Sequence, residues 1–293
     1  MSLAKHRPIS RRSALGVLGG LGAGLVGLLA TLRGGSPAVR ITAGTVRDVE
    51  TFGELTGEWW VPPALTGRRP TVVLVHGGYW RSGYDRTLEN PVAADLAGRG
   101  FLVWNLDYRS SATPWPATLT DVAAGYDHLL RGRHADRVDP GRVAVVGHSA
   151  GGHLALWLAS RSRLPAGAPG AVSAGPRVAL AVAQAPVASF VRAAREGLGD
   201  GAVDALLGGT PAQQSAHLAI ADPLALLPSG TRTVLVHGTG DDIVPISQSE
   251  DYLAAATAKG GEVRLVRVPG GHFEHLDPRS AAVEALRTAL ATL

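Results

Sequence analysis

The sequence predicts a doubly wound α/β fold built on a mainly parallel sheet, and two observations carry this prediction. Continuous apolar runs without polar alternation recur along the chain, which is typical of strands buried on both faces. Helical segments lie between these runs, and such alternation favours a sheet with helices on its faces. The chain has 293 residues, of which 45% are hydrophobic and 18% charged, so it can form one substantial packed core.

The expected elements follow from the local patterns. Residues 46–52 and 54–61, bounded by Gly53 and by Pro62-Pro63, predict two short antiparallel strands. The later apolar runs predict strands over residues 71–76, 101–107, 142–147, 178–184, 233–237 and 263–268. The segments between them predict helices over residues 90–99, 118–133, 149–160, 247–259 and 278–293.

One stretch interrupts this rhythm. Residues from about 186 to 228 contain only short helical pieces, bounded by Pro186 and Pro228. We expect this stretch to form a small lid insertion within a single domain that spans residues 41–293.

The first forty residues have the pattern of an export signal. Ser10-Arg11-Arg12 precedes an uncharged run of Gly, Leu, Ala and Val over residues 14–32, which is the layout of a secretory signal. The paired arginines resemble a twin-arginine signal, which implies export of an already folded protein. Ser36-Pro37-Ala38 is a candidate cleavage site. A retained membrane anchor remains an alternative, because the run is long enough to span a bilayer.

Composition excludes several partners and cofactors. The net charge is +4, but the basic residues form no stripe with interleaved aromatics, so no nucleic-acid partner is expected. The chain contains no cysteine, which excludes disulfides, cysteine metal sites and a cysteine nucleophile. The histidines lack ligand spacing such as H-E-x-x-H, and we expect no metal ion.

The candidate nucleophile is Ser149. It lies in Gly147-His148-Ser149-Ala150-Gly151, which follows a predicted buried strand and opens a predicted helix. This G-x-S-x-G pattern is typical of a nucleophile elbow, where the serine adopts a strained backbone and its hydroxyl projects above the sheet. The positions two residues before and after it must then lack side chains. The pattern predicts attack of Ser149 on an ester or amide carbonyl.

A second motif predicts an oxyanion hole. His76-Gly77-Gly78-Tyr79-Trp80 follows the first long parallel strand. The N–H of Ala150, directly after the nucleophile, and those of Gly78 and Tyr79 are the expected donors. Glycine lets the backbone approach the carbonyl oxygen closely, and one such donor contributes roughly 10²–10³ in turnover. His76 itself is expected to orient this loop.

The acid and the base follow later strands. Asp241 comes after the strand at 233–237, and His272 comes after the last strand, preceded by Gly270-Gly271. The chain order Ser149, Asp241, His272 is the order of this type of site, and open α/β sheets build their sites at these strand ends. His272 would accept the Ser149 proton and return it to the leaving group, while the ionised aspartate orients the imidazole.

Other assignments remain open at this point. Asp242 is an alternative acid, and His275 is an alternative base. The remaining histidines near these motifs are expected to be structural; they are His148, His153 and His237.

From about residue 45 to 293 the sequence resembles α/β-hydrolases of the esterase/lipase superfamily. Within it, His76–Trp80 together with Gly147–Gly151 is similar to the arylformamidase (kynurenine formamidase) group and its esterase relatives. In that group His-Gly-Gly-x-Trp supplies the oxyanion loop, and no metal or organic cofactor is used. Asp107-Tyr108-Arg109 also resembles this superfamily. His237–Pro245 resembles its acid loop, which implies that Asp241 is the acid.

The resemblance implies hydrolysis of a small-molecule ester or amide. The export signal favours an exported carboxylesterase, secreted or in the cell envelope, over a cytosolic formamidase. Any membrane contact would then be through the uncleaved signal. A peptidase of the same fold is disfavoured because no large gating domain is present. A catalytically inactive binding protein is disfavoured by the complete set of candidate residues.

Overall fold

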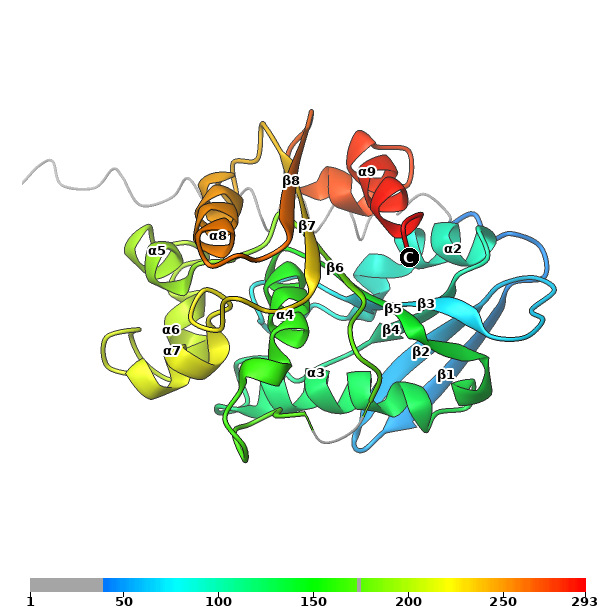
Figure 1. The fold of residues 1–293 in the computed structure, drawn as a ribbon, viewed down its shortest axis with the longest axis horizontal. Helices are drawn as coiled ribbons and strands as arrows, with labels where there is room; N and C mark the ends of the chain where they lie inside the picture. Colours follow the sequence, from blue (N-terminus) through cyan, green and yellow to red (C-terminus); the bar gives the residue numbers. More distant parts are fainter. Residues whose placement is uncertain (1–38, 173–174) are drawn as a thin grey trace, which may run out of the picture. The chain divides into compact units, whose positions relative to one another are not determined.

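A twisted sheet runs through the middle of the fold, and helices cover both of its faces (Figure 1). The computed structural model describes residues 39–172 and 175–293, and residues 40–293 form one unit. The expected export signal therefore falls almost entirely outside the described residues. Within the described ranges, no helix combines the length and the apolar character needed to cross a membrane.

The strand order across the sheet is β1-β2-β4-β3-β5-β6-β7-β8. The first two strands form an antiparallel hairpin, and β2 also pairs antiparallel with β4, whereas every later pairing is parallel. The strands are β1 Val46–Phe52, β2 Leu55–Val61, β3 Arg69–Val75, β4 Leu102–Leu106, β5 Val138–His148, β6 Leu180–Gln184, β7 Arg232–Gly238 and β8 Val263–Val268. The predicted fold class, a mainly parallel sheet flanked by helices, is confirmed.

Two helices pack on one face of the sheet. They are α2 (Asn90–Gly98) and α9 (Ala281–Leu290), joined by an ion pair between Asp95 and Arg287 at 2.8 Å. The other face carries α3 (Ala117–Asp127), α4 (Ala150–Ala159) and α8 (Ser247–Ala258) (Figure 1). Short 3₁₀ turns occur at Arg86–Glu89, His128–Leu130, Ala135–Arg137, Arg161–Arg163 and Phe273–Leu276.

The stretch between residues 186 and 228 contains three short helices, which Figure 1 shows grouped beside α4 and α8. They are α5 (Phe190–Arg195), α6 (Ala202–Leu207) and α7 (Ser215–Ala221). Side chains of the main body anchor both ends of this stretch. Gln248 Oε1 accepts hydrogen bonds from Ala188 N (3.0 Å) and Ser189 N (2.7 Å), and His153 Nε2 bonds Ala221 O (2.9 Å). We call residues 186–228 the cap.

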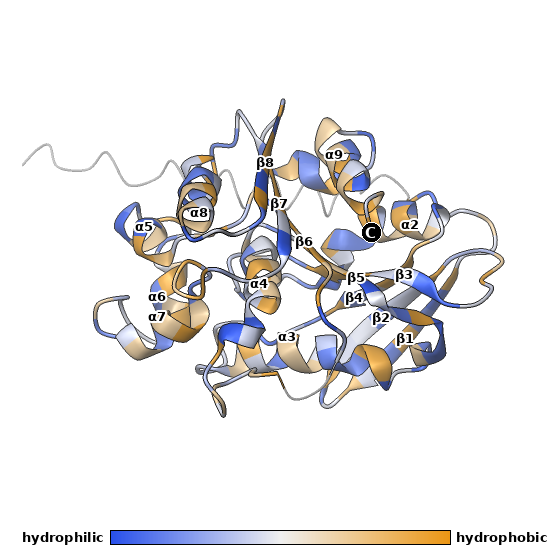
Figure 2. Ribbon diagram, viewed as in Figure 1, coloured by the Kyte–Doolittle hydropathy of each residue, from blue (hydrophilic) through white to orange (hydrophobic). Residues whose placement is uncertain are grey.

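The core follows the central strands. The residues of β3, β5 and β6 that form the middle of the sheet are fully buried, and Figure 2 shows hydrophobic colour along much of these strands. The prediction of burial on both faces is wrong for β8. Arg264 and Arg267 of this strand are exposed, because β8 forms the edge of the sheet.

Several boundaries differ from those expected. The helix predicted over 118–133 ends at Asp127, because the chain tightens into the 3₁₀ turn His128–Leu130. The last helix begins at Ala281 because Ser280 caps it, its hydroxyl accepting a hydrogen bond from Val283 N at 3.1 Å. The strand β5 begins at Val138, earlier than expected, because Val138 pairs with Arg69 before an irregularity in the register; the residues between Val138 and Val143 lack apolar patterning.

Candidate active site

The predicted site residues gather at one edge of the sheet, where the parallel strands end. Ser149 follows β5, and the turn that contains Gly78 and Tyr79 follows β3. Asp241 follows β7 and His272 follows β8. Because these strands run parallel, their carboxyl ends meet at the same edge, and residues far apart in sequence become neighbours.

Ser149 occupies a strained bend between β5 and α4. Its backbone angles are φ 59° and ψ −119°, outside the regions that a serine ordinarily adopts. The Ser149 N–H donates to Gln184 O of the neighbouring strand at 2.8 Å, which fixes the bend in place. A Cβ at Gly147 would lie 2.1 Å from Gly151 O, and one at Gly151 would lie 1.9 Å from Val75 O. Both flanking positions therefore require glycine, as the motif predicts.

The acid and base candidates are hydrogen-bonded to each other. His272 Nδ1 lies 2.7 Å from Asp241 Oδ2, and both side chains are buried. The other carboxylate oxygen, Oδ1, accepts hydrogen bonds from Ile243 N at 3.0 Å and Val244 N at 2.9 Å. This arrangement orients one ring nitrogen of His272 toward the carboxylate and leaves the other available for proton transfer.

The surroundings of Asp241 keep it ionised. Burial alone would raise its pKa, but hydrogen bonds from His237 and His272 and from Val244 N–H outweigh that effect and hold the pKa well below its ordinary value. His237 Nε2 lies 3.5 Å from Asp241 Oδ2 and bonds Val244 O at 2.8 Å. The sequence predicts only a structural role for His237. Its contact with Asp241 is seen in the tertiary structure.

Ser149 and His272 are connected through the residue before the nucleophile. His148 Nε2 donates to His272 O at 2.9 Å, and the two imidazole rings have centroids 4.4 Å apart. Burial, together with the nearby His272 and His275, lowers the pKa of His148 well below its ordinary value, so its ring is neutral. The hydrogen bonds among the described residues do not include one from Ser149 Oγ to His272 Nε2. That contact therefore belongs to the mechanism proposed below.

The turn after β3 lies directly against Ser149. A Cβ at Gly77 would be 3.1 Å from Ser149 Cβ and 2.9 Å from His148 O. The next residues, Gly78 and Tyr79, have positive φ angles of 110° and 50°. Neither of their N–H groups donates a hydrogen bond to another described residue. Ala150 is the first residue of α4, where helix N–H groups lack intrahelical partners and the helix dipole favours negative charge.

Residues of the Asp107–Arg109 motif contact this turn and the elements around it. The Tyr108 hydroxyl donates to His76 O at 2.8 Å, and the Tyr108 and His76 rings stack with centroids 4.1 Å apart. Asp107 pairs with Arg86, which leads into α2, and Arg109 pairs with Asp121 at 2.7 Å. The three residues of the Asp107–Arg109 motif therefore each contact a different neighbour, and Tyr108 is the one that contacts the turn after β3.

The alternative acid and base lie in different surroundings. Asp242 is exposed, and Asp241 is the aspartate that contacts His272. His275 is fully buried, and its Nδ1 lies 3.4 Å from Gln184 Nε2. Burial, with the nearby His272 and His237, lowers the pKa of His275 to about 3. His153 holds the cap through Ala221 O, as described above. The geometry favours Asp241 and His272.

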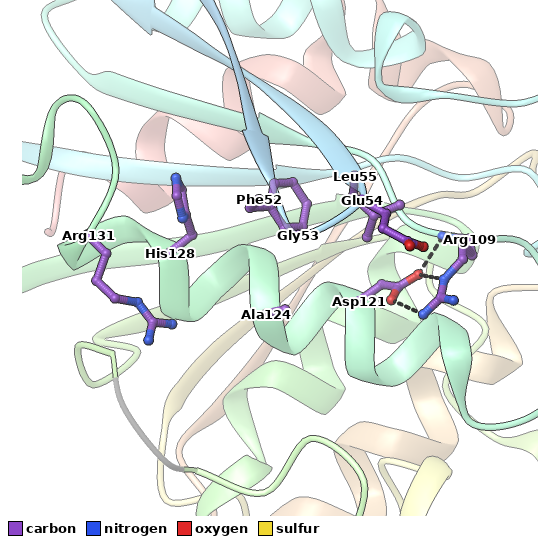
Figure 3. Close-up of a pocket in the computed structure, with 9 residues that line it drawn as sticks. All are labelled: Phe52, Gly53, Glu54, Leu55, Arg109, Asp121, Ala124, His128 and Arg131. Atoms are coloured by element: carbon purple, nitrogen blue, oxygen red, sulfur yellow. Dashed lines mark hydrogen bonds and ion pairs between the residues drawn. The ribbon is translucent and has the colours of Figure 1, made fainter.

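A separate surface groove lies between the β1–β2 turn and α3 (Figure 3). It is lined by Phe52, Glu54, Arg109, Asp121 and His128, among others, and contains none of the predicted site residues. Figure 3 shows that two of its charged residues, Arg109 and Asp121, pair with each other. Within residues 39–172 and 175–293, no group of three or more His, Asp or Glu side chains is placed to hold a metal ion.

The sheet order, the nucleophile elbow after β5 and the acid–histidine pair after β7 and β8 define an α/β-hydrolase. The BD-FAE family model matches residues 58–255, and the chain belongs to this family. The prediction of an α/β-hydrolase from the esterase superfamily is thus confirmed, whereas the closer resemblance to arylformamidases stays a prediction.

The relatives that match include several carboxylic ester hydrolases. The probable carboxylic ester hydrolase LipM of Mycobacterium tuberculosis is 27% identical over 64% of this chain and 45% of its own length. Esterase LipQ of the same organism is 27% identical over 73% of this chain and 52% of its own length. The chain thus spans about half the length of these relatives.

Solved structures show the same fold. Esterase B from Lactobacillus rhamnosis superposes with a TM-score of 0.78, at 21% identity over 92% of this chain and 91% of that one. The butyrate-bound esterase Est2 from Thermogutta terrifontis superposes with a TM-score of 0.65, at 23% identity over 85% of this chain and 92% of that one. At these sequence identities, both similarities concern the fold alone.

Proposed function

We propose that the protein is a serine esterase that hydrolyses carboxylic esters through an acyl-enzyme on Ser149. The observation that carries this proposal is the buried Asp241–His272 pair beside a serine held at φ 59° in a strand-to-helix bend. The naming of LipM and LipQ as ester hydrolases supports the choice of ester substrates. We expect small or medium acyl groups.

In the proposed mechanism, His272 Nε2 accepts the proton of Ser149 as Oγ attacks the ester carbonyl carbon. The resulting oxyanion accepts hydrogen bonds from the N–H groups of Gly78, Tyr79 and Ala150. His272 then protonates the departing alcohol as the ester C–O bond breaks. Water then attacks the acyl carbon as His272 takes its proton, the bond to Ser149 Oγ breaks, and His272 returns the proton to Oγ, which releases the carboxylic acid. Asp241 stays ionised throughout and stabilises the imidazolium.

A fluorophosphonate probe tests the nucleophile, and a substrate panel tests the chemistry. We expect covalent labelling of the wild-type protein, and we expect Ser149→Ala to abolish labelling and lower turnover by roughly 10⁴-fold or more while the fold stays intact. A Ser149→Ala protein that still turned over p-nitrophenyl esters normally would overturn the assignment.

The second candidate function is hydrolysis of an aryl formamide such as N-formylkynurenine. The motif His76–Trp80 favours it, because the same pattern occurs in arylformamidases. Both functions use the same triad, so a panel that contains p-nitrophenyl esters beside N-formylkynurenine separates them. The ester proposal expects the higher kcat/KM on the p-nitrophenyl esters, and the reverse order would favour the formamidase.

We also propose that residues 1–40 direct export of the folded enzyme by a twin-arginine route. The support is the sequence pattern of paired Arg11-Arg12 followed by an uncharged run.

A further inference from the structure

The oxyanion turn has a backbone that requires external support. Three consecutive residues have positive φ angles, namely Gly78 at 110°, Tyr79 at 50° and Trp80 at 54°. Only glycine adopts such angles readily, so Tyr79 and Trp80 hold this conformation only where surrounding contacts enforce it. The contacts of the Tyr79 side chain identify where this enforcement comes from.

The Tyr79 side chain reaches from the oxyanion turn to the acid loop. Its hydroxyl donates to Ile243 O at 3.1 Å, although the two residues are 164 positions apart in the chain. The N–H of the same residue, Ile243, donates to Asp241 Oδ1 at 3.0 Å. Tyr79 and Asp241 therefore hold the same short segment, one through the carbonyl of Ile243 and the other through its amide.

The cap holds the tyrosine ring in this position. A Cβ at Gly199 would lie 2.5 Å from Tyr79 Cδ1, so the backbone of the cap packs directly against the ring. Arg81, at the end of the same turn, donates to the carbonyl oxygens of Gly199 and Asp200, the latter at 3.2 Å. Tyr79 as a whole is 7% exposed. Burial, with the nearby Asp241, raises the pKa of Tyr79 to about 12, so the hydroxyl keeps its proton and remains a donor.

We propose that the Tyr79 side chain is a positioning group that ties the oxyanion turn to the acid loop. Through it, the N–H donors of the turn and the Asp241–His272 pair keep one fixed mutual geometry. This inference rests on the proposed function, because it assigns the N–H groups of Gly78 and Tyr79 to the oxyanion hole. It adds a role for the tyrosine hydroxyl that the backbone motif does not require.

The test is Tyr79→Phe, which removes the hydroxyl and keeps the ring. We expect kcat on a p-nitrophenyl ester to fall about 3- to 10-fold, the range of one lost hydrogen bond, with KM changed less than twofold. Affinity for an alkyl boronic acid, which forms a tetrahedral adduct on the serine, should fall by the same factor as kcat/KM. A purely structural role would lower thermal stability and leave both quantities unchanged.

Tyr126→Phe is the matched control. Tyr126 is also buried, and its hydroxyl also donates to a backbone carbonyl, Pro176 O at 2.9 Å, but it lies on α3 away from the proposed site. We expect it to lose stability to a similar extent while kcat and boronic acid affinity stay unchanged. If Tyr79→Phe fails to fold, Gly199→Ala serves instead, because its methyl group would displace the ring while the hydroxyl remains. Since Gly199 has φ 60°, alanine also strains the cap backbone, so the loss of kcat is compared with the loss of thermal stability, and a loss of kcat beyond that of Tyr126→Phe is expected.

The outcomes separate this inference from the proposed function. A wild-type protein that a fluorophosphonate does not label at Ser149, and that hydrolyses no ester, would remove the proposed function itself. A wild-type protein that is labelled and active, with Tyr79→Phe equal to it in kcat and in boronic acid affinity, would overturn only the positioning role.

Discussion

At the scale of single residues, burial distinguishes the two adjacent aspartates of the acid loop. The Asp241 carboxylate receives two backbone N–H groups and contacts two histidines, whereas Asp242 is exposed. A carboxylate in such a hydrogen-bonding environment is ionised and fixed in orientation, both of which a histidine base requires of its partner. These surroundings are the physical reason to assign the acid to Asp241.

Replacement of each aspartate tests this assignment. Asp241→Asn should lower kcat on the order of 10⁴-fold, by analogy with the serine-protease triad, because the amide no longer stabilises the imidazolium. Asp242→Asn serves as the adjacent control and should change kcat less than about threefold, since surface substitutions generally have small effects. Steady-state kinetics on a p-nitrophenyl ester measures both. The reverse pattern would show that Asp242 is the acid.

Glu89 is an ionisable residue that the proposed mechanism does not use. It lies at the end of the 3₁₀ turn before α2 and is 1% exposed, and neither carboxylate oxygen has a partner among the described residues. Burial raises its pKa to about 8, so the carboxyl group is largely protonated at neutral pH.

This shift predicts a pH dependence of stability. Because the folded-state pKa lies above the unfolded value of 4.5, the contribution of Glu89 is fully present below pH 4.5 and is lost as pH rises toward 8. Glu89→Gln should abolish this loss. The difference in unfolding free energy between variant and wild type should grow by up to about 1.4 kcal/mol per pH unit across that window. Urea denaturation at pH 5 and pH 8 measures it.

Glu54→Gln is the control, because Glu54 is exposed in the turn between β1 and β2. Its stability difference from the wild type should be nearly independent of pH over the same window. An equally flat difference for Glu89→Gln would contradict the raised pKa.

At the scale of elements, Ser149, the proposed nucleophile, is positioned by close backbone packing between β5, α4 and the end of β3. Gly151 lies where a Cβ would be 1.9 Å from Val75 O and 2.6 Å from His76 O. Both obstacles are backbone atoms, which cannot move aside as a flexible side chain can. The helix that follows Ser149 can therefore approach the sheet only because this position lacks a side chain.

Gly151→Ala tests this close approach. The added methyl group should destabilise the protein by about 1–3 kcal/mol or more, the usual cost of overpacking, and should lower kcat by displacing Ser149 and Ala150. Gly141→Ala in β5 is the control, since the nearest atom to its Cβ would be Asp139 Oδ1 at 3.5 Å, an ordinary contact. Thermal denaturation compares the two variants. Equal stability would mean that the packing around Gly151 is looser than the structure shows.

At the scale of the whole molecule, residues 40–293 contain the complete sheet and every proposed catalytic group. The cap is the one long insertion predicted in the body of the chain, and it is held at both ends by residues of α4 and α8. Its contacts with Tyr79 and Arg81 link it to the proposed oxyanion hole. Changes in the cap should therefore affect turnover.

The proposed export route gives a prediction about the N-terminal segment. Arg11→Lys combined with Arg12→Lys should block export in a host that has the twin-arginine route, and active enzyme should accumulate inside the cell. Arg7→Lys, outside the pair, should be exported normally. Activity measured in extracellular and intracellular fractions distinguishes these outcomes. Undiminished export of the double variant would exclude the twin-arginine route.

The sequence by itself determined the fold class, the elbow around Ser149 and the order of the later motifs. These features depend on short-range patterns, namely apolar runs, glycine spacing and turn residues. Each of these patterns is visible within a single segment of the sequence. Short-range patterns do not give the exact end of a helix or the place of a strand in the sheet. For this reason the helix end at Asp127 and the burial of β8 were not predicted correctly. Helix ends depend on local capping and tightening, and burial depends on the place of a strand in the sheet.

Only the tertiary structure decided which groups contact one another across the sheet edge. The contact of His272 with Asp241, the support of Asp241 by His237, and the hydrogen bond from Tyr79 to Ile243 all depend on it. Such contacts join segments separated by strands and helices, so they are set by strand order and by the packing of loops at the carboxyl ends. The burial of Glu89 also depends on the tertiary structure, because the sequence around a charged residue does not reveal which elements will cover it.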